Sequence, residues 1–165
     1  MDSELKRELI IENYNNPVNK GLTNDSIYIK GENNNSSCID HFTIELKLDN
    51  DIIKDIRFDG EACAIATSSL SIAISKLIGK TKDEAFNIIN NYINMIDGKE
   101  YDKALLEELS IYEDVSKQPA RVKCATLGIE GIKNLLKKWK IYKNWIIEEK
   151  YKQKYIFLFF IIKLL

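Results

Sequence analysis

The sequence has no excess of charge of either sign, and it has few cysteines, two prolines and one histidine. Its 24 Lys and Arg residues nearly balance its 25 Asp and Glu residues. We therefore expect no nucleic-acid partner, because proteins that bind nucleic acid carry clustered positive charge. A hydrophobic share of 45% and a charged share of 30% are instead typical of a globular protein, and 165 residues favour one domain.

The N-terminus also lacks the features of a targeting peptide. Residues 1–5 read Met-Asp-Ser-Glu-Leu, with no basic and no apolar segment, so we expect a cytoplasmic protein. Near the other end, residues 155–162 form an apolar run about half as long as the roughly 20 residues of a membrane span. The preferred interpretation of residues 140–165 is a basic and then apolar extension without a role of its own. The alternative is a basic amphipathic helix that touches a membrane.

The three cysteines form no C-x-x-C pair, and an odd number does not suit a disulfide framework. Cys38, Cys63 and Cys124 are either buried, inert thiols, which is the default for scattered cysteines, or ligands. Each is expected where a loop meets a strand or a helix, and a helix N-terminus lowers the pKa of a thiol. Asp40 follows Cys38 by two residues and can face the same side of an extended chain. Three thiolates and one carboxylate make the four ligands of a tetrahedral zinc ion.

Other candidates for chemistry are weaker. Ser68 and Ser69 have no base in a recognisable triad arrangement, and no glycine-rich phosphate loop is present, so hydrolase chemistry is rejected. His41, the only histidine, is expected to be a residue of a strand at the sheet edge rather than a ligand. Arg121 is either a residue that steers a partner or one member of a plain ion pair. Lys123 either favours the thiolate of its neighbour or is simply solvated, and solvation is the preferred interpretation.

The spacing of apolar residues predicts an α+β fold, in which helices pack on one face of a small antiparallel sheet. Alternation over residues 42–48 and an apolar face over 52–58 predict a hairpin with Thr43, Glu45 and Lys47 turned away from the core. A short strand is expected at 27–29, within a turn-rich segment. Helices are expected in five segments: 4–14, 63–78, from a capping box at 81–84 to Gly98, 100–110, and from about 122 onward. The last helix contains Gly128 and Gly131, which cost about 1 kcal/mol each, so tertiary packing must hold it.

Several segments taken together resemble the U-type iron–sulfur cluster assembly proteins, the family of SufU, IscU and the N-terminal part of NifU. Lys123, where the IscU branch has histidine, and an inserted segment at 95–117 place the chain in the SufU branch. Ser36, Ile39 and Ala62 depart from the family pattern, which has Pro, Gly and Gly at these positions. The segments that carry the resemblance are Asn16-Pro17, Asn19-Lys20-Gly21, Cys38-Ile39-Asp40, Phe58-Asp59-Gly60-Glu61-Ala62-Cys63 and Pro119 to Leu127.

The resemblance implies a SufU/IscU-like domain over residues 1–139, with the extension at 140–165. It also implies zinc bound by Cys38, Asp40, Cys63 and Cys124. Cys38 would accept sulfur as a persulfide from a SufS-like cysteine desulfurase, in a sulfurtransferase-type activity, and a downstream iron–sulfur scaffold would receive it. Two alternatives stay open: a scaffold that builds a [2Fe–2S] cluster on the same four residues, and a degenerate member that acts only as an interaction module.

Overall fold

The computed structural model describes residues 2–34 and 39–139, and the chain divides into two units, residues 1–135 and 136–165. In the first unit, β1 (Ile29–Asn34), β2 (His41–Asp49) and β3 (Ile52–Asp59) form an antiparallel sheet in the order β1-β2-β3. The predicted α+β class is therefore confirmed. The domain boundary at residue 139 stays a prediction, and the extension at 140–165 lies outside the described residues.

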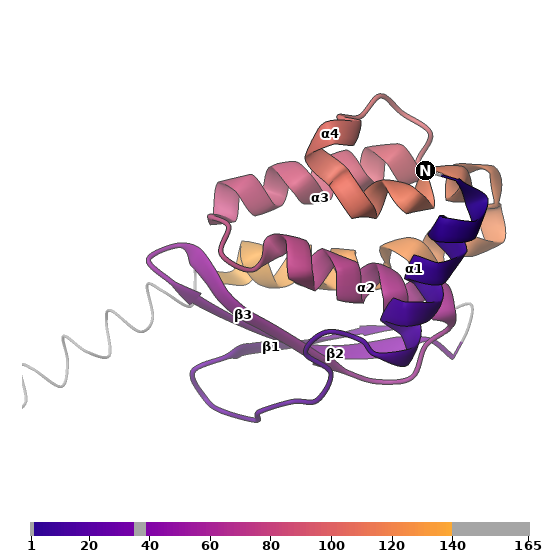
Figure 1. Cartoon of the computed structure of the whole chain (residues 1–165). Coiled ribbons are helices and arrows are strands. Elements are labelled where there is room, and N and C mark those ends of the chain that lie inside the picture. Colours follow the sequence, from indigo (N-terminus) through magenta and orange to yellow (C-terminus); the bar gives the residue numbers. More distant parts are fainter. Residues whose placement is uncertain (1, 35–38, 140–165) are drawn as a thin grey trace, which may run out of the picture. The chain divides into compact units, whose positions relative to one another are not determined.

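Helices cover one face of this sheet (Figure 1). Nearest to the strands lie α2 (Ala64–Leu77) and the first part of a helix at 119–139. A second layer above them contains α3 (Lys82–Ile96), α4 (Lys103–Leu106) and the 3-10 helix η1 (Glu107–Lys117), while α1 (Ser3–Asn15) packs on α2. Across the described ranges, no helix has the length and apolar character needed to cross a membrane.

The hairpin turns the predicted apolar side chains toward the core. Phe42, Ile44, Leu46 and Leu48 are all buried, and the rings of Phe42 and Phe58 meet edge to face. The connecting turn lies at Asn50 and Asp51, whose positive φ angles of 49° and 63° suit a tight hairpin turn. Because side chains alternate along a strand, this register turns Glu45 toward the opposite face.

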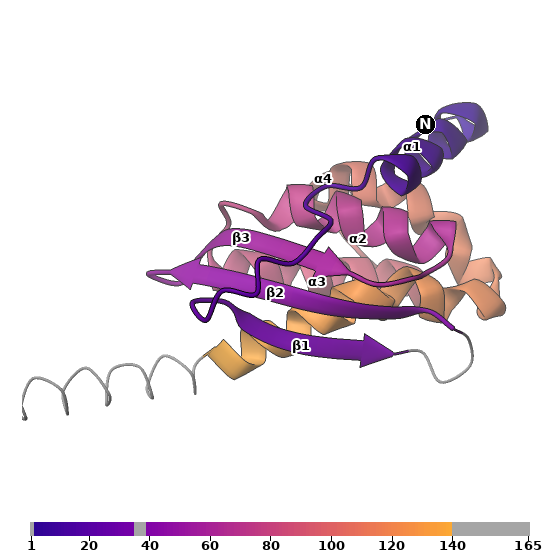
Figure 2. The same ribbon diagram turned by 90° about the horizontal axis from the view of Figure 1, so that it is seen from below.

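On that opposite face Glu45 is buried rather than open to solvent, although Thr43 and Lys47 beside it are only half-buried. The segment before β1 crosses the sheet there (Figure 2), and the Glu45 carboxylate accepts hydrogen bonds from the backbone N–H groups of Thr23 and Asn24 at 2.8 and 3.0 Å. Burial raises the pKa of Glu45, but the hydrogen bonds outweigh it, and the net pKa is lowered. The short strand expected at 27–29 is also wrong, because β1 begins at Ile29 and includes two asparagines that the sequence assigned to a loop.

Local signals place most helices correctly. The capping box is present, since the Thr81 hydroxyl accepts from the Glu84 N–H and the Glu84 carboxylate accepts from the Thr81 N–H. Gly98 follows the end of α3 with a φ of 72°. The helix expected at 100–110 is only partly right, because four α-helical residues lead into a 3-10 helix that continues to Lys117.

The two glycines inside the final helix allow close approach. A methyl group at Gly128 would lie 2.8 Å from the Leu70 side chain of α2, and one at Gly131 would lie 2.6 Å from Ile44 of β2. The helix can lie this close to both elements only because these positions have no side chain. The cost of glycine in a helix is therefore offset by packing, as the sequence required.

Candidate metal centre

Three of the four predicted ligands lie together at one end of α2. A carboxylate oxygen of Asp40 and the Sγ atoms of Cys63 and Cys124 all lie within 4.8 Å of one another. They come from three places in the fold: the entry to β2, the start of α2 and the final helix. Cys38, the fourth predicted ligand, lies outside the described residues.

A tight loop brings Asp40 and Cys63 together. Asp40 is 3% exposed, and its Oδ1 accepts the backbone N–H of Cys63 at 3.0 Å. The loop is tied down by a second bond, from the His41 N–H to the Glu61 carbonyl at 3.0 Å. Gly60 makes this approach possible, because its φ is +139° and a Cβ there would collide with the His41 carbonyl oxygen.

Cys63 is the N-cap residue of α2, as its position after Gly60 predicts. Its side chain makes no capping hydrogen bond and is exposed, so the thiol is available at the surface of the site. Ala62 stands where the resembled family has glycine, and it is not among the described residues with positive φ. The backbone at Ala62 therefore needs no glycine.

Cys124 lies deeper, and two expectations about it need correction. The helix begins at Pro119, so Cys124 is in the second turn rather than at the N-terminus. Its pKa is not lowered by the helix but raised, to about 12. Burial is the main cause, followed by the negative charge of Cys63, a hydrogen bond to Asp40 and a hydrogen bond to Cys63. Acidic groups crowded in this way repel one another unless a cation lies between them.

The donor set fits a single metal ion. Zinc binds cysteine sulfur at about 2.3 Å, which places two tetrahedral sulfur ligands roughly 3.8 Å apart. The ligand atoms of Asp40, Cys63 and Cys124 lie within 4.8 Å, so small side-chain movements reach this spacing. Two thiols with a carboxylate are a combination that zinc accepts.

The weaker candidates lie around this centre without joining it. His41 begins β2, the central strand rather than an edge strand, and its ring Nδ1 lies 3.2 Å from the Ile39 carbonyl oxygen. Arg121 and Lys123 are exposed on the first turns of the final helix. Among the described residues, the group of possible ligand atoms does not include His41.

Sequence reasoning missed the buried hydroxyl groups beneath the site. Ser68, considered only as a nucleophile, is fully buried, and its Oγ lies 2.6 Å from the hydroxyl oxygen of Tyr112 in η1. A signal was present, because α2 carries several serines on a helix that is mostly apolar and largely buried. Buried hydroxyls need partners, so serines in a core helix indicate a polar contact with another element.

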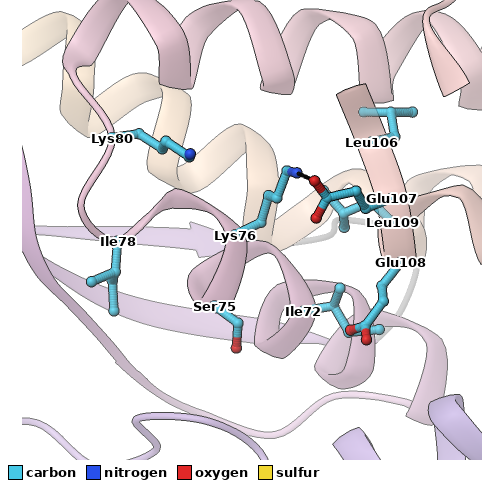
Figure 3. A pocket seen from close by; sticks show the side chains of 9 residues that line it. All are labelled: Ile72, Ser75, Lys76, Ile78, Lys80, Leu106, Glu107, Glu108 and Leu109. Atoms are coloured by element: carbon cyan, nitrogen blue, oxygen red, sulfur yellow. Dashed lines mark ion pairs between the residues drawn. The ribbon is translucent and has the colours of Figure 1, made fainter. Parts of the chain in front are cut away.

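A hollow of about 390 Å³ lies elsewhere, between α2 and the segment at 106–109 (Figure 3). Lys76 of α2 points across it to Glu107, with 2.7 Å between Nζ and Oε1, and Lys80 lies on its rim. Glu107 adopts a φ of 49°, an uncommon value for a residue with a side chain. Neither Cys63 nor Cys124 is among the described residues that line this hollow, so it is separate from their site.

Comparison with known proteins identifies the family of the chain. The NifU-like N terminal domain family matches residues 5–95. The zinc-dependent sulfurtransferase SufU of Bacillus subtilis is 40% identical over 129 residues, which are 78% of this chain and 86% of that protein. The chain belongs to the SufU/IscU family of iron–sulfur cluster assembly proteins.

Both branches of the family are represented among its relatives. The iron–sulfur cluster assembly scaffold protein IscU of Thermotoga maritima is 33% identical over 131 residues, covering 79% of this chain and 92% of IscU. A crystal structure of a SUF-system scaffold protein from Fervidobacterium islandicum superposes with a TM-score of 0.73 at 34% identity, covering 82% of this chain and 99% of that one. The SufU/IscU fold is thus shared along nearly the full length of these relatives.

Proposed function

We propose that this SufU/IscU family member is a zinc-dependent sulfur acceptor and carrier in iron–sulfur cluster assembly. Cys38, Asp40, Cys63 and Cys124 would hold the zinc ion, and Cys38 would accept sulfur from a cysteine desulfurase of the SufS kind. The identity to the Bacillus subtilis sulfurtransferase supports this choice of branch. So does Lys123, which stands where the IscU branch has histidine.

The chemistry is an exchange between a thiolate and a persulfide. The Cys38 thiolate attacks the outer sulfur of the desulfurase persulfide, a new S–S bond forms, and the old S–S bond breaks. Cys38 then carries the persulfide, and the desulfurase cysteine leaves as a thiolate, so no oxidant is needed. Bound zinc would keep the thiols deprotonated at neutral pH. Asp40 holds the N-terminal end of α2 through the Cys63 N–H and so keeps Cys63 beside the Asp40 carboxylate.

The compactness of the donor set is the observation that carries the proposal. Asp40, Cys63 and Cys124 place three ligand atoms within 4.8 Å of one another, a spacing that suits one coordination sphere. A [2Fe–2S] cluster divides its four ligands between two irons, so at least one of these three would bind the other iron and lie farther away. The geometry therefore favours one zinc ion over the cluster scaffold.

The first test is the metal and acid-labile sulfide content of protein purified without oxygen. We expect about one zinc per chain, from the four-ligand stoichiometry of such sites, and neither iron nor sulfide. A desulfurase assay should then show persulfide on the wild-type chain and none on Cys38→Ala. Cys38→Ser serves as the matched control, since a hydroxyl fills the same space but cannot form a persulfide.

Three outcomes contradict the proposal. Iron and sulfide in equal amounts would make the protein a cluster scaffold, as the IscU relatives are named. Persulfide on Cys38→Ala would remove the acceptor role from Cys38. A folded chain that binds no metal would instead support the interaction module.

A further inference from the structure

Two buried tyrosines lie side by side, and their hydroxyl groups contact the two helices that carry the candidate zinc thiols. Tyr92 comes from α3 and Tyr112 from η1, and both side chains are almost fully buried. Their ring centroids are 6.2 Å apart and the rings meet at 79°, an edge-to-face arrangement. Such a pair has a defined geometry and fixes how its two elements meet.

The hydroxyl of Tyr112 is connected to the residue after Cys63. The Ser68 hydroxyl donates to the Ala64 carbonyl at 2.6 Å. Because that uses the only proton on Ser68 Oγ, the Tyr112 hydroxyl donates to Ser68, also at 2.6 Å. Ala64 is the first residue of α2 and directly follows Cys63. Tyr112 therefore fixes the first turn of the helix that presents the Cys63 thiol.

The hydroxyl of Tyr92 is connected to the residue after Cys124. It donates to the Ala125 carbonyl oxygen at 3.1 Å. Ala125 is buried on the final helix and directly follows Cys124. Each tyrosine thus holds the backbone next to one thiol, and the contact between the two rings joins these anchors into one unit.

We propose that Tyr92 and Tyr112 are positioning residues that set the spacing between the Cys63 and Cys124 thiols. The inference rests on the proposed zinc function and deepens it, because it gives the inserted segment at 95–117, which contains Tyr112, a role at the metal centre. The hydroxyls make the connection specific, since an apolar ring alone would fill the core without contacting Ser68 or the Ala125 carbonyl. Residues that orient metal ligands typically change metal affinity by about 10- to 100-fold.

The experiment compares Tyr112→Phe and Tyr92→Phe with Ser71→Ala. The two Phe variants keep the aromatic ring and remove only the hydroxyl. Ser71→Ala is a matched control, because Ser71 carries a buried hydroxyl on α2, the helix of Ser68. The Ser71 hydroxyl donates to Asn13 of α1 at 2.7 Å, away from the thiols. Zinc affinity is measured by competition with a chromogenic chelator, and the site is also loaded with Co²⁺ to read its absorption bands.

We expect each Phe variant to bind zinc about 10-fold more weakly and to change the Co²⁺ bands that report tetrahedral geometry. Ser71→Ala should lose stability but keep the zinc affinity and the Co²⁺ spectrum. If both Phe variants keep the wild-type affinity and spectrum, the tyrosines only fill the core and the inference is overturned.

A measurement without metal separates this inference from the proposed function. In a Cys38→Ala background, phenylarsine oxide can bind only the pair of Cys63 and Cys124, and it needs both thiols close together. Its affinity should fall in Tyr112→Phe and stay unchanged in Ser71→Ala. A wild-type chain that binds no zinc would defeat the proposed function, while an arsenical affinity that is equal in all variants would defeat the positioning role.

Discussion

At the scale of single residues, the geometry of the candidate centre depends on one glycine that is not itself a ligand. Gly60 lets the loop after β3 pass directly over the His41 carbonyl, and this passage delivers Cys63 to Asp40. The residue with which a Gly60 side chain would collide is His41, which lies nearly twenty residues earlier in the sequence. Such a contact is set by tertiary structure, so local pattern cannot reveal it.

We expect Gly60→Ala to lower the free energy of unfolding by about 3 kcal/mol, because it adds backbone strain to a steric collision. Gly79→Ala is the matched control, since Gly79 has a φ of +83° but open space around its Cβ position. Strain alone there should cost about 1 kcal/mol. Urea unfolding measures both, and equal losses in the two variants would show that the contact with His41 adds nothing.

At the scale of elements, an ionic cluster joins η1 to α1 and to the start of α4. The Glu113 carboxylate contacts Lys103 Nζ at 2.7 Å and Lys6 Nζ at 2.9 Å, and it accepts from the Tyr101 hydroxyl at 3.2 Å. Hydrogen bonds from Lys103 and then from Lys6 hold the pKa of Glu113 at about 2. The cluster therefore ties the 3-10 helix to two neighbouring helices, in addition to its buried apolar contacts.

This cluster should make stability depend on pH. A carboxyl with a folded pKa of about 2 and an ordinary value of 4.5 stabilises the fold above pH 4.5, and this contribution is lost as pH falls toward 2. We expect Glu113→Gln to cost about 1 kcal/mol at pH 7, a small value because solvent screens partly exposed pairs. The cost should shrink in acid.

The comparison is a series of urea unfolding curves between pH 7 and pH 3 for wild type and variant. Glu130→Gln, which alters an exposed carboxylate on the final helix, is the control and should track wild type. A difference between wild type and Glu113→Gln that stays constant with pH would contradict the assignment.

Element boundaries show where sequence patterns stop being informative. The capping box, Gly98 and the alternation in β2 predicted their elements because each signal is local. The segment at 100–117 was only partly predicted, because its 3-10 helix is held by contacts with α2 and α3 rather than by a helical repeat. β1 was misplaced for a related reason: its asparagines pair with β2 although their type favours turns.

At the scale of the whole molecule, the fold brings together residues that are far apart in the sequence and that all suit metal binding. Three of the four predicted ligands meet in the described part of the chain. Family resemblance, more than spacing, identified them, since Cys63 and Cys124 are 61 residues apart. What could not be predicted is the burial that raises the pKa of Cys124, because it depends on how closely the final helix packs.

Removal of zinc should destabilise the whole fold, since the ion would join β2, α2 and the final helix. At free zinc about 1,000 times the Kd, binding contributes about 4 kcal/mol, so EDTA should lower Tm by roughly 10 °C. The Cys63→Ser/Cys124→Ser variant is the control and should show no response to EDTA. A wild-type Tm that is unchanged after zinc has been removed would refute this coupling.

The order of the candidate ligands along the chain has a consequence for synthesis. Asp40 and Cys63 leave the ribosome early, but Cys124 lies on the last described helix. Domains form as their chain emerges from the N-terminal end, so a nascent chain exposes one thiol of the pair well before its partner. A four-ligand centre could therefore close only after Cys124 has been made. Until then, the exposed thiol of Cys63 would lack this partner.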